Sequence, residues 1–151
     1  MTVPKPLRLL IPLAALVLIA AQSVTPPRAT VAPSRTTMDG VYTSAQAAEG
    51  RDLFASACQS CHTPTVHAGP PFRNKWFGRN LGELFGYMRR EMPKSDPGSL
   101  SDEEYAIAIA YILRINGMPA GNVALIADSA ALVNIRIDSV RLAPTTPGHR
   151  R

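Results

Sequence analysis

The stretch that decides the fold covers residues 57–72 and reads "ACQSCHTPTVHAGPPF". It holds both cysteines of the 151-residue chain, Cys58 and Cys61, in a Cys-x-x-Cys spacing, and His62 follows directly. Two thiols beside an imidazole indicate a site that uses sulfur and nitrogen together. Three kinds of site fit that description.

A redox dithiol of the thioredoxin kind opens a helix after a strand, whereas the residues before Cys58 have helical spacing. A structural zinc needs four protein ligands, so His62 and His67 would have to complete a set within ten residues. Covalent haem attachment has Cys-x-x-Cys-His as its signature, with thioether bonds from both cysteines and the histidine under the iron. The motif favours one haem c held by Cys58 and Cys61, with His62 on the iron and no disulfide.

The N-terminus has the pattern of an export signal. Basic Lys5 and Arg8 precede an apolar run of 13 residues, 9–21, which is shorter than the ~20 needed to span a bilayer. We therefore expect residues 1–23 to be a cleaved signal peptide, or alternatively an N-terminal anchor. Either reading places the rest in the periplasm, free or tethered to the outer face of the inner membrane.

Composition separates the remaining regions. Residues 24–41 are rich in Pro and Thr and predict an extended linker, residues 42–138 a folded domain, and residues 139–151 a loose tail. Without Lys5 and Arg8, 14 of the 16 basic residues remain against 11 acidic ones, a net charge near +3. That charge is too low for a nucleic-acid binder.

The domain predicts an all-α fold without strands. Thr43 and Gln46 form a capping box for a first helix that runs to the cysteines, and Gly50 within it indicates close contact with another helix. The prolines and glycine of residues 63–72 predict a loop. A second helix covers residues 80–92, and Pro93 ends it. A long helix from Ser101 to Gly117 is apolar on almost every side, which predicts burial on more than one face. Residues 122–138 hold one short helix.

Several side chains could bind the iron opposite His62. Met92 and Met118 each precede a proline, Met92 in a loop after a helix and Met118 after the long helix. Met88 lies on an apolar helix face, which favours packing over ligation. Met92 is the favoured ligand; Met118, His67 or an open position are the alternatives.

Residues 44–121 closely resemble the single-haem class I cytochromes c. "GRDLFASACQSCH" is similar to the first helix and attachment site of that family, and "GPPF" to the loop that supports the proximal histidine. "WFGRNLGELFGYMRREMPKSDPGSLSDEEYAIAIAYILRINGMPAG" is similar to a bacterial subgroup associated with quinoprotein-type dehydrogenases. The resemblance implies a small class I cytochrome c fold, with three main helices and short helical segments around one haem.

The resemblance also implies roles for single residues. The Pro70 carbonyl would accept a hydrogen bond from His62 Nδ1, and Trp76 would lie beside a haem propionate. Met92, in the first Met-Pro pair, would be the sixth ligand. Gly50 and Phe54 would cross the last helix near Ala110 and Tyr111.

The function so implied is one-electron transfer in the periplasm by a haem with His/Met ligation, without catalysis by the protein itself. Its partners would be a redox donor and acceptor, with a quinoprotein dehydrogenase or a terminal oxidase as candidates, and a membrane only if the N-terminal segment is retained. Two alternatives are a haem-based small-ligand sensor with peroxidase-like activity and a dedicated cytochrome subunit of a dehydrogenase or oxidase complex.

Overall fold

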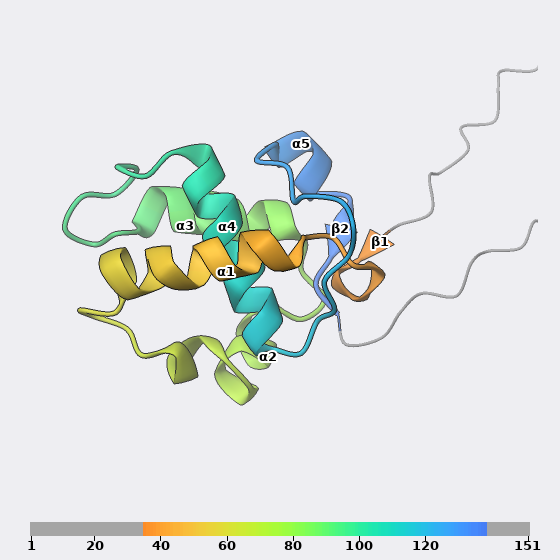
Figure 1. Ribbon diagram of the computed structural model, residues 1–151, viewed down its shortest axis with the longest axis horizontal. Helices are drawn as coiled ribbons and strands as arrows, with labels where there is room; N and C mark the ends of the chain where they lie inside the picture. Colours follow the sequence, from red (N-terminus) through yellow and green to blue (C-terminus); the bar gives the residue numbers. More distant parts are fainter. Residues whose placement is uncertain (1–34, 139–151) are drawn as a thin grey trace, which may run out of the picture. The chain divides into compact units, whose positions relative to one another are not determined.

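The computed structural model describes residues 35–138. The predicted signal peptide, residues 24–34 of the predicted linker and the predicted tail lie outside them. The elements in chain order are β1 (Arg35–Thr36), η1 (Thr37–Asp39), α1 (Ser44–Leu53), η2 (Phe54–Cys58), η3 (Pro64–His67), α2 (Pro70–Trp76), α3 (Leu81–Glu91), α4 (Asp102–Ile115), α5 (Ser129–Leu132) and β2 (Ile135–Arg136). Figure 1 shows the helices packed around α4, which confirms the all-α prediction. Within the described residues, no helix is both long and apolar enough to cross a membrane.

The crossing of α1 and α4 organises the fold. The Thr43–Gln46 capping box is present, and α1 continues into the π-helical turn η2 that carries Cys58. A Cβ atom at Gly50 would lie 1.8 Å from the Ile107 carbonyl oxygen, so only glycine permits this approach. One turn on, the Phe54 ring packs against Tyr111, with 5.4 Å between centroids. The predicted close contact at Gly50 is confirmed.

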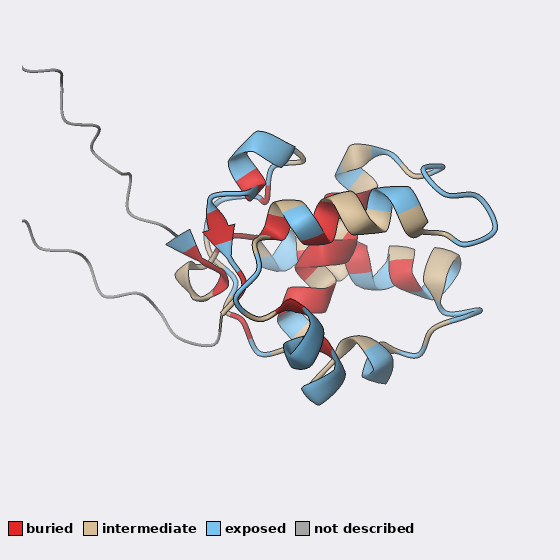
Figure 2. Cartoon of the chain, turned by 180° about the vertical axis from the view of Figure 1, so that it is seen from behind, coloured by how far each residue is buried: buried red, intermediate tan, exposed pale blue. Residues whose placement is uncertain are grey.

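Helix α4 is the centre of the hydrophobic core. Ser101 caps it, Glu104 completes the capping box, and three acidic residues of its first turn favour the positive end of the helix dipole. Figure 2 shows burial concentrated along this helix, whose buried residues are Tyr105, Ala106, Ala108, Ile109, Ala110, Ile112 and Leu113. This set covers more than one helix face, as the apolar pattern predicted.

The prediction of a loop over residues 63–72 was wrong. Pro64 begins the short 3₁₀ helix η3, and Pro70 and Pro71 open α2. A proline at the start of a helix costs little, since the N–H groups of the first turn have no intrahelical partner and its φ already suits a helix. Gly69 precedes them with φ 62°, a conformation that suits glycine.

The prediction of no strands was also wrong. Strands β1 and β2 pair in parallel, Arg35 with Ile135 and Thr36 with Arg136. Thr37 is fully buried, and its hydroxyl donates to the Asp138 carbonyl at 3.0 Å. Residues 35–41, which the sequence placed in the linker, thus belong to the packed domain.

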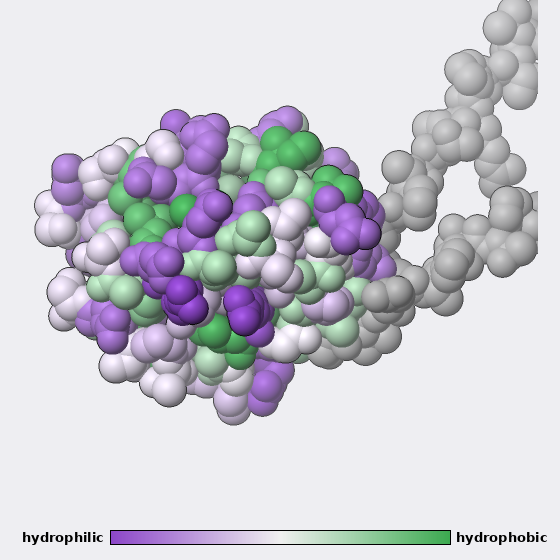
Figure 3. Space-filling view, in the orientation of Figure 1, coloured by the Kyte–Doolittle hydropathy of each residue, from purple (hydrophilic) through white to green (hydrophobic). Residues whose placement is uncertain are grey.

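The chain after α4 returns along the start of α1. The Gly121 N–H donates to the Tyr42 carbonyl at 2.7 Å, and the Tyr42 hydroxyl donates to the Met118 carbonyl at 2.6 Å. The predicted short helix is present as α5. On the face seen in Figure 3, apolar surface gathers over α5; the exposed apolar residues of this segment are Val123, Ile126 and Val133.

Candidate haem site

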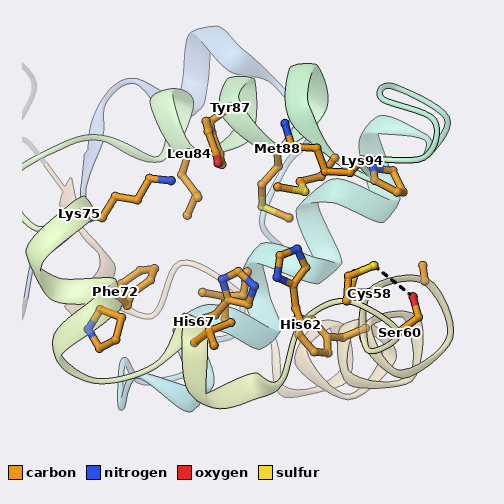
Figure 4. Close-up of a pocket in the computed structure, with 18 of the residues that line it drawn as sticks. Cys58, Ser60, His62, His67, Phe72, Lys75, Leu84, Tyr87, Met88 and Lys94 are labelled. Atoms are coloured by element: carbon orange, nitrogen blue, oxygen red, sulfur yellow. Dashed lines mark hydrogen bonds between the residues drawn. The ribbon is translucent and has the colours of Figure 1, made fainter.

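A cavity of about 400 Å³ opens between two walls of the domain (Figure 4). We call one the histidine wall: Cys58, Cys61, His62, Val66, His67 and Pro71. The other is the methionine wall, formed by α3 and the residues after it: Leu84, Tyr87, Met88, Met92, Pro93 and Lys94. Side chains from α2 and Ile112 of α4 close the space between them. Five of the six residues predicted for the site line this cavity.

Cys58 is the last residue of η2 and Cys61 lies in the turn that follows, and both line the histidine wall. Cys58 is half-buried and Cys61 is exposed. Burial raises the pKa of the Cys58 thiol, whereas a redox dithiol requires a lowered pKa. Within residues 35–138, no group of three or more His, Cys, Asp and Glu side chains is placed to hold a metal ion.

His62 and His67 stand next to each other in the histidine wall. Their ring centroids are 4.9 Å apart, and His67 also meets the Phe54 ring edge-on at 5.8 Å. Burial, followed by the nearby His62 and Lys75, lowers the pKa of His67. Because both imidazoles come from one wall, as Figure 4 shows, His67 is poorly placed to bind an iron opposite His62.

The methionines divide clearly. Met92 and Met88 line the cavity from the methionine wall, while Met118 is 3 % exposed in the core and does not line it. Met92 has extended backbone, φ −132° and ψ 148°, as the following proline predicted. The buried Tyr105 of α4 donates its hydroxyl to the Met92 carbonyl at 2.6 Å. This bond fixes the backbone of Met92 at the cavity.

Trp76 and Pro70 have different surroundings. Trp76 is 5 % exposed, lines the cavity and meets Tyr87 edge-on, with 5.4 Å between centroids. Pro70 is exposed at the first position of α2 and does not line the cavity, whereas Pro71 does. The hydrogen bond from His62 to the Pro70 carbonyl stays a prediction.

Sequence reasoning missed Lys75, Tyr87 and Tyr105 as parts of the site. The Lys75 ammonium lies 3.9 Å from the centre of the Tyr87 ring, although the two residues belong to different helices. Met88 packs against the hydrophobic core, as its helix face predicted, and it also lines the cavity. The sequence signal for a place at the cavity was its spacing, because residues four apart lie on the same side of a helix and Met88 is four residues before Met92.

The residues present fit a haem c. The cavity volume is in the range of small-molecule sites, and its lining is largely aromatic and aliphatic, as an apolar macrocycle requires. Both thiols and His62 lie at one wall, in the order that covalent attachment needs, and two thioethers lie at the other. An all-α fold with such a site is what a c-type cytochrome requires.

Comparison with known families agrees with this class. Residues 45–112 match the family model described as cytochrome c oxidase, cbb3-type, subunit III. No curated protein and no solved structure matches the chain. The matched segment contains Cys58, Cys61 and His62, and the match supports a monohaem cytochrome c with covalently bound haem c and a role in electron transfer. The association with quinoprotein-type dehydrogenases is not confirmed by this match.

Proposed function

We propose that the protein is an exported electron carrier in which His62 and Met92 are the axial ligands of the haem iron. The observation that carries this proposal is the anchoring of Met92. Its carbonyl accepts the Tyr105 hydroxyl at 2.6 Å, and its N–H donates to the Met88 carbonyl at 2.8 Å. Met92 thus sits at the cavity in a fixed backbone conformation, on the wall that faces His62.

The other candidates for the sixth ligand are less suitable. Met118 is buried in the core, and its carbonyl is held by Tyr42 at 2.6 Å. His67 shares a wall with His62. Met88 is the serious rival, since it lines the same cavity, but as a helical residue it can move only by changing its rotamer. Met92 lies just beyond the end of α3, and its bonds with Tyr105 and Met88 hold its backbone at the cavity.

Ligation on both faces supports electron transfer over ligand binding. When bound, haem c supplies a one-electron couple between ferric and ferrous iron. His62 and Met92 would hold the iron from the two walls, and thioether ligation would favour a raised reduction potential. The apolar side chains of the cavity exclude water, and α1 and α4, locked at Gly50, hold the geometry constant. A sensor or peroxidase-like protein would instead need an open position on the iron.

Export is supported by the N-terminal sequence. Basic residues followed by a 13-residue apolar run have the form of a signal peptide or short anchor, and haem is attached to such motifs in bacteria on the periplasmic side. We infer a periplasmic location, either free or tethered to the inner membrane. N-terminal sequencing of the mature protein from a periplasmic extract would distinguish the two.

The partners follow from the surface charge and the family description. Between residues 73 and 94 there are six basic and two acidic residues. Three of the basic ones are already paired, Arg79 with Glu83 at 2.6 Å, Arg89 with Asp102 at 3.2 Å and Lys94 with Glu91 at 2.9 Å. Of the other three, Lys75 lines the cavity, while Arg73 and Arg90, which form no salt bridge within residues 35–138, would steer an acidic partner. Transfer rates with the true partner should then fall as salt rises.

A second candidate function is favoured by the family match. The model is described as subunit III of a cbb3-type cytochrome c oxidase, so the protein is also a candidate for a dedicated cytochrome subunit of an oxidase complex. A quinoprotein dehydrogenase remains the partner implied by the sequence resemblance. Isolating the intact chain from solubilised membranes and identifying the complex that accompanies it separates a dedicated subunit from a free carrier.

The ligand assignment is tested with paired variants. Met92→Ala should abolish the sulfur-to-iron charge-transfer band of the oxidised protein, lower the reduction potential and open the iron to carbon monoxide. Met88→Leu, close to conserving volume, should leave all three nearly unchanged. The reverse result would move the ligand to Met88. Carbon monoxide binding by the unmodified protein would favour the sensor reading.

A further inference from the structure

Lys75 brings a positive charge to the cavity from the side of α2. Its ammonium lies 3.9 Å from the centre of the Tyr87 ring and 5.1 Å from that of Trp76, so two aromatic rings of different helices hold it. Figure 4 shows the side chain reaching from α2 toward Tyr87. Aromatic faces attract a cation without neutralising its charge. The arrangement therefore positions the ammonium and leaves its charge available.

Lys75 differs in this respect from its basic neighbours. Lys94 lines the same cavity, but its ammonium is 2.9 Å from a Glu91 carboxylate oxygen. Arg79 lies over the ring of Trp76, which Lys75 also contacts, but Arg79 is paired with Glu83. Among residues 35–138, Lys75 forms no salt bridge. It is thus a cavity-lining cation whose protein contacts are aromatic.

The groups around Lys75 do not supply a carboxylate that is free to bind it, so a ligand with a carboxylate would be a suitable partner. His62 and His67 come from the histidine wall, and Tyr87, Glu91 and Lys94 from α3 and the residues after it. Glu91 is the acidic member of this set, and Lys94 already binds it. A ligand in the cavity that is apolar in its body and carries carboxylates at its edge would satisfy both the aromatic lining and the ammonium. Haem has this chemistry.

We propose that Lys75 is a positioning residue that binds a carboxylate of the haem, with the rings of Tyr87 and Trp76 holding its ammonium at the cavity. The inference rests on haem attachment and does not depend on which methionine is the sixth ligand. Its consequence concerns the redox balance. A positive charge held at a haem carboxylate would favour the ferrous form, which has one positive charge less, and so would raise the reduction potential.

Chemical modification of the native, haem-loaded full chain tests the contact directly. With a limiting amount of acetic anhydride, we expect Lys75 to be acetylated several-fold more slowly than Lys94, as quantified by peptide mass spectrometry. Unfolding should remove the difference. Tyr87→Leu should speed acetylation of Lys75, while Tyr87→Phe, which keeps the ring, should not. Equal rates for Lys75 and Lys94 in the native protein would overturn the proposal.

Reduction potentials supply an independent measurement. Lys75→Gln should lower the potential, Lys75→Arg should restore most of it, and Lys94→Gln, which removes the same charge from the methionine wall, should lower it less. Equal shifts for Lys75→Gln and Lys94→Gln would show a general effect of surface charge and refute a specific contact. A haem stain of each denatured variant reports attachment separately, so loss of the haem cannot be mistaken for loss of the Lys75 contact.

Discussion

The two walls of the cavity are held in different ways. From residue 57 to residue 71, the stretch that contains the histidine wall, no residue is buried, and its helices are short. The methionine wall rests on α3, an 11-residue helix capped by Asn80, with Leu84 and Phe85 buried beneath it. One wall therefore has a protein core behind it, and the other does not.

Among the described residues, one side chain from outside the stretch hydrogen-bonds to it, and the buried Phe54 ring packs on His67. Asn116, at the end of α4, donates to the His67 carbonyl at 2.7 Å and accepts from the Gly69 N–H at 2.9 Å. A wall with one polar clamp and no buried residue gains most from covalent bonds to its ligand. We conclude that packing against the core stabilises the methionine wall, whereas the histidine wall depends on the thioether bonds to the haem for its stability.

Removing the covalent bonds should have the largest effect. In Cys58→Ser/Cys61→Ser, we expect acid-acetone to extract the haem and the denatured protein to lose its haem stain. Hydrogen exchange should rise over residues 59–69 and stay within a few-fold of the parent in α3, because only the histidine wall depends on the bonds. Equal loss of protection in both walls would contradict the comparison.

The second effect concerns the anchor of the methionine wall. Tyr105→Phe removes the donor to the Met92 carbonyl and should lower the free energy of unfolding by about 1–3 kcal/mol, as expected when a partly buried acceptor loses its partner. Urea denaturation measures this. Tyr111→Phe, which keeps the ring contact with Phe54, is the matched control and should change stability much less.

The clamp of the histidine wall predicts a smaller and local effect. Asn116→Ala should cost about 1 kcal/mol and speed proteolysis within residues 59–69, because the 67–69 backbone loses its bonds to α4. Asn134→Ala is the control, because the Asn134 amide donates to the Ala130 carbonyl at 3.1 Å, away from the histidine wall. If both variants are cleaved at the same rate within residues 59–69, Asn116 is not the clamp.

The smallest effect is a pH dependence in the histidine wall. The folded pKa of His67 lies below its ordinary value of 6.5, mainly through burial, so the unfolded chain binds this proton more readily. The contribution of His67 to stability is present above about pH 6.5 and is lost as the pH falls from there toward the folded pKa. His67→Gln should flatten the decline in stability between pH 7.5 and 5, measured by urea denaturation.

Some of these features could be predicted from the sequence because their causes are local. The capping boxes at Thr43 and Ser101 depend on residues three apart, and Gly50 stands out as a glycine within a helical pattern. The attachment motif is contained in five residues. Each needs no knowledge of the distant chain.

Other features could not be predicted, since they depend on contacts between distant segments. Strands of two residues show no alternation, and β1 pairs with β2 a hundred positions away. Two adjacent prolines predict a break in regular structure, whereas Pro70 and Pro71 lie in the first turn of α2, which tolerates both. The hydrogen bond from Tyr105 to Met92 and the contact of Lys75 with Tyr87 each join two elements, and only the fold brings them together.

The pairing of β1 with β2 has a consequence for how the domain can be combined with others. Arg35 begins β1, and Asp138 lies two residues after the end of its partner β2, so the first and last described residues are close together. Neither residue lines the haem cavity. Domains whose ends meet in this way tolerate insertion into a host loop and circular permutation. The cytochrome unit is therefore portable: it can be joined to another protein at one point on its surface while the haem site stays open to a partner.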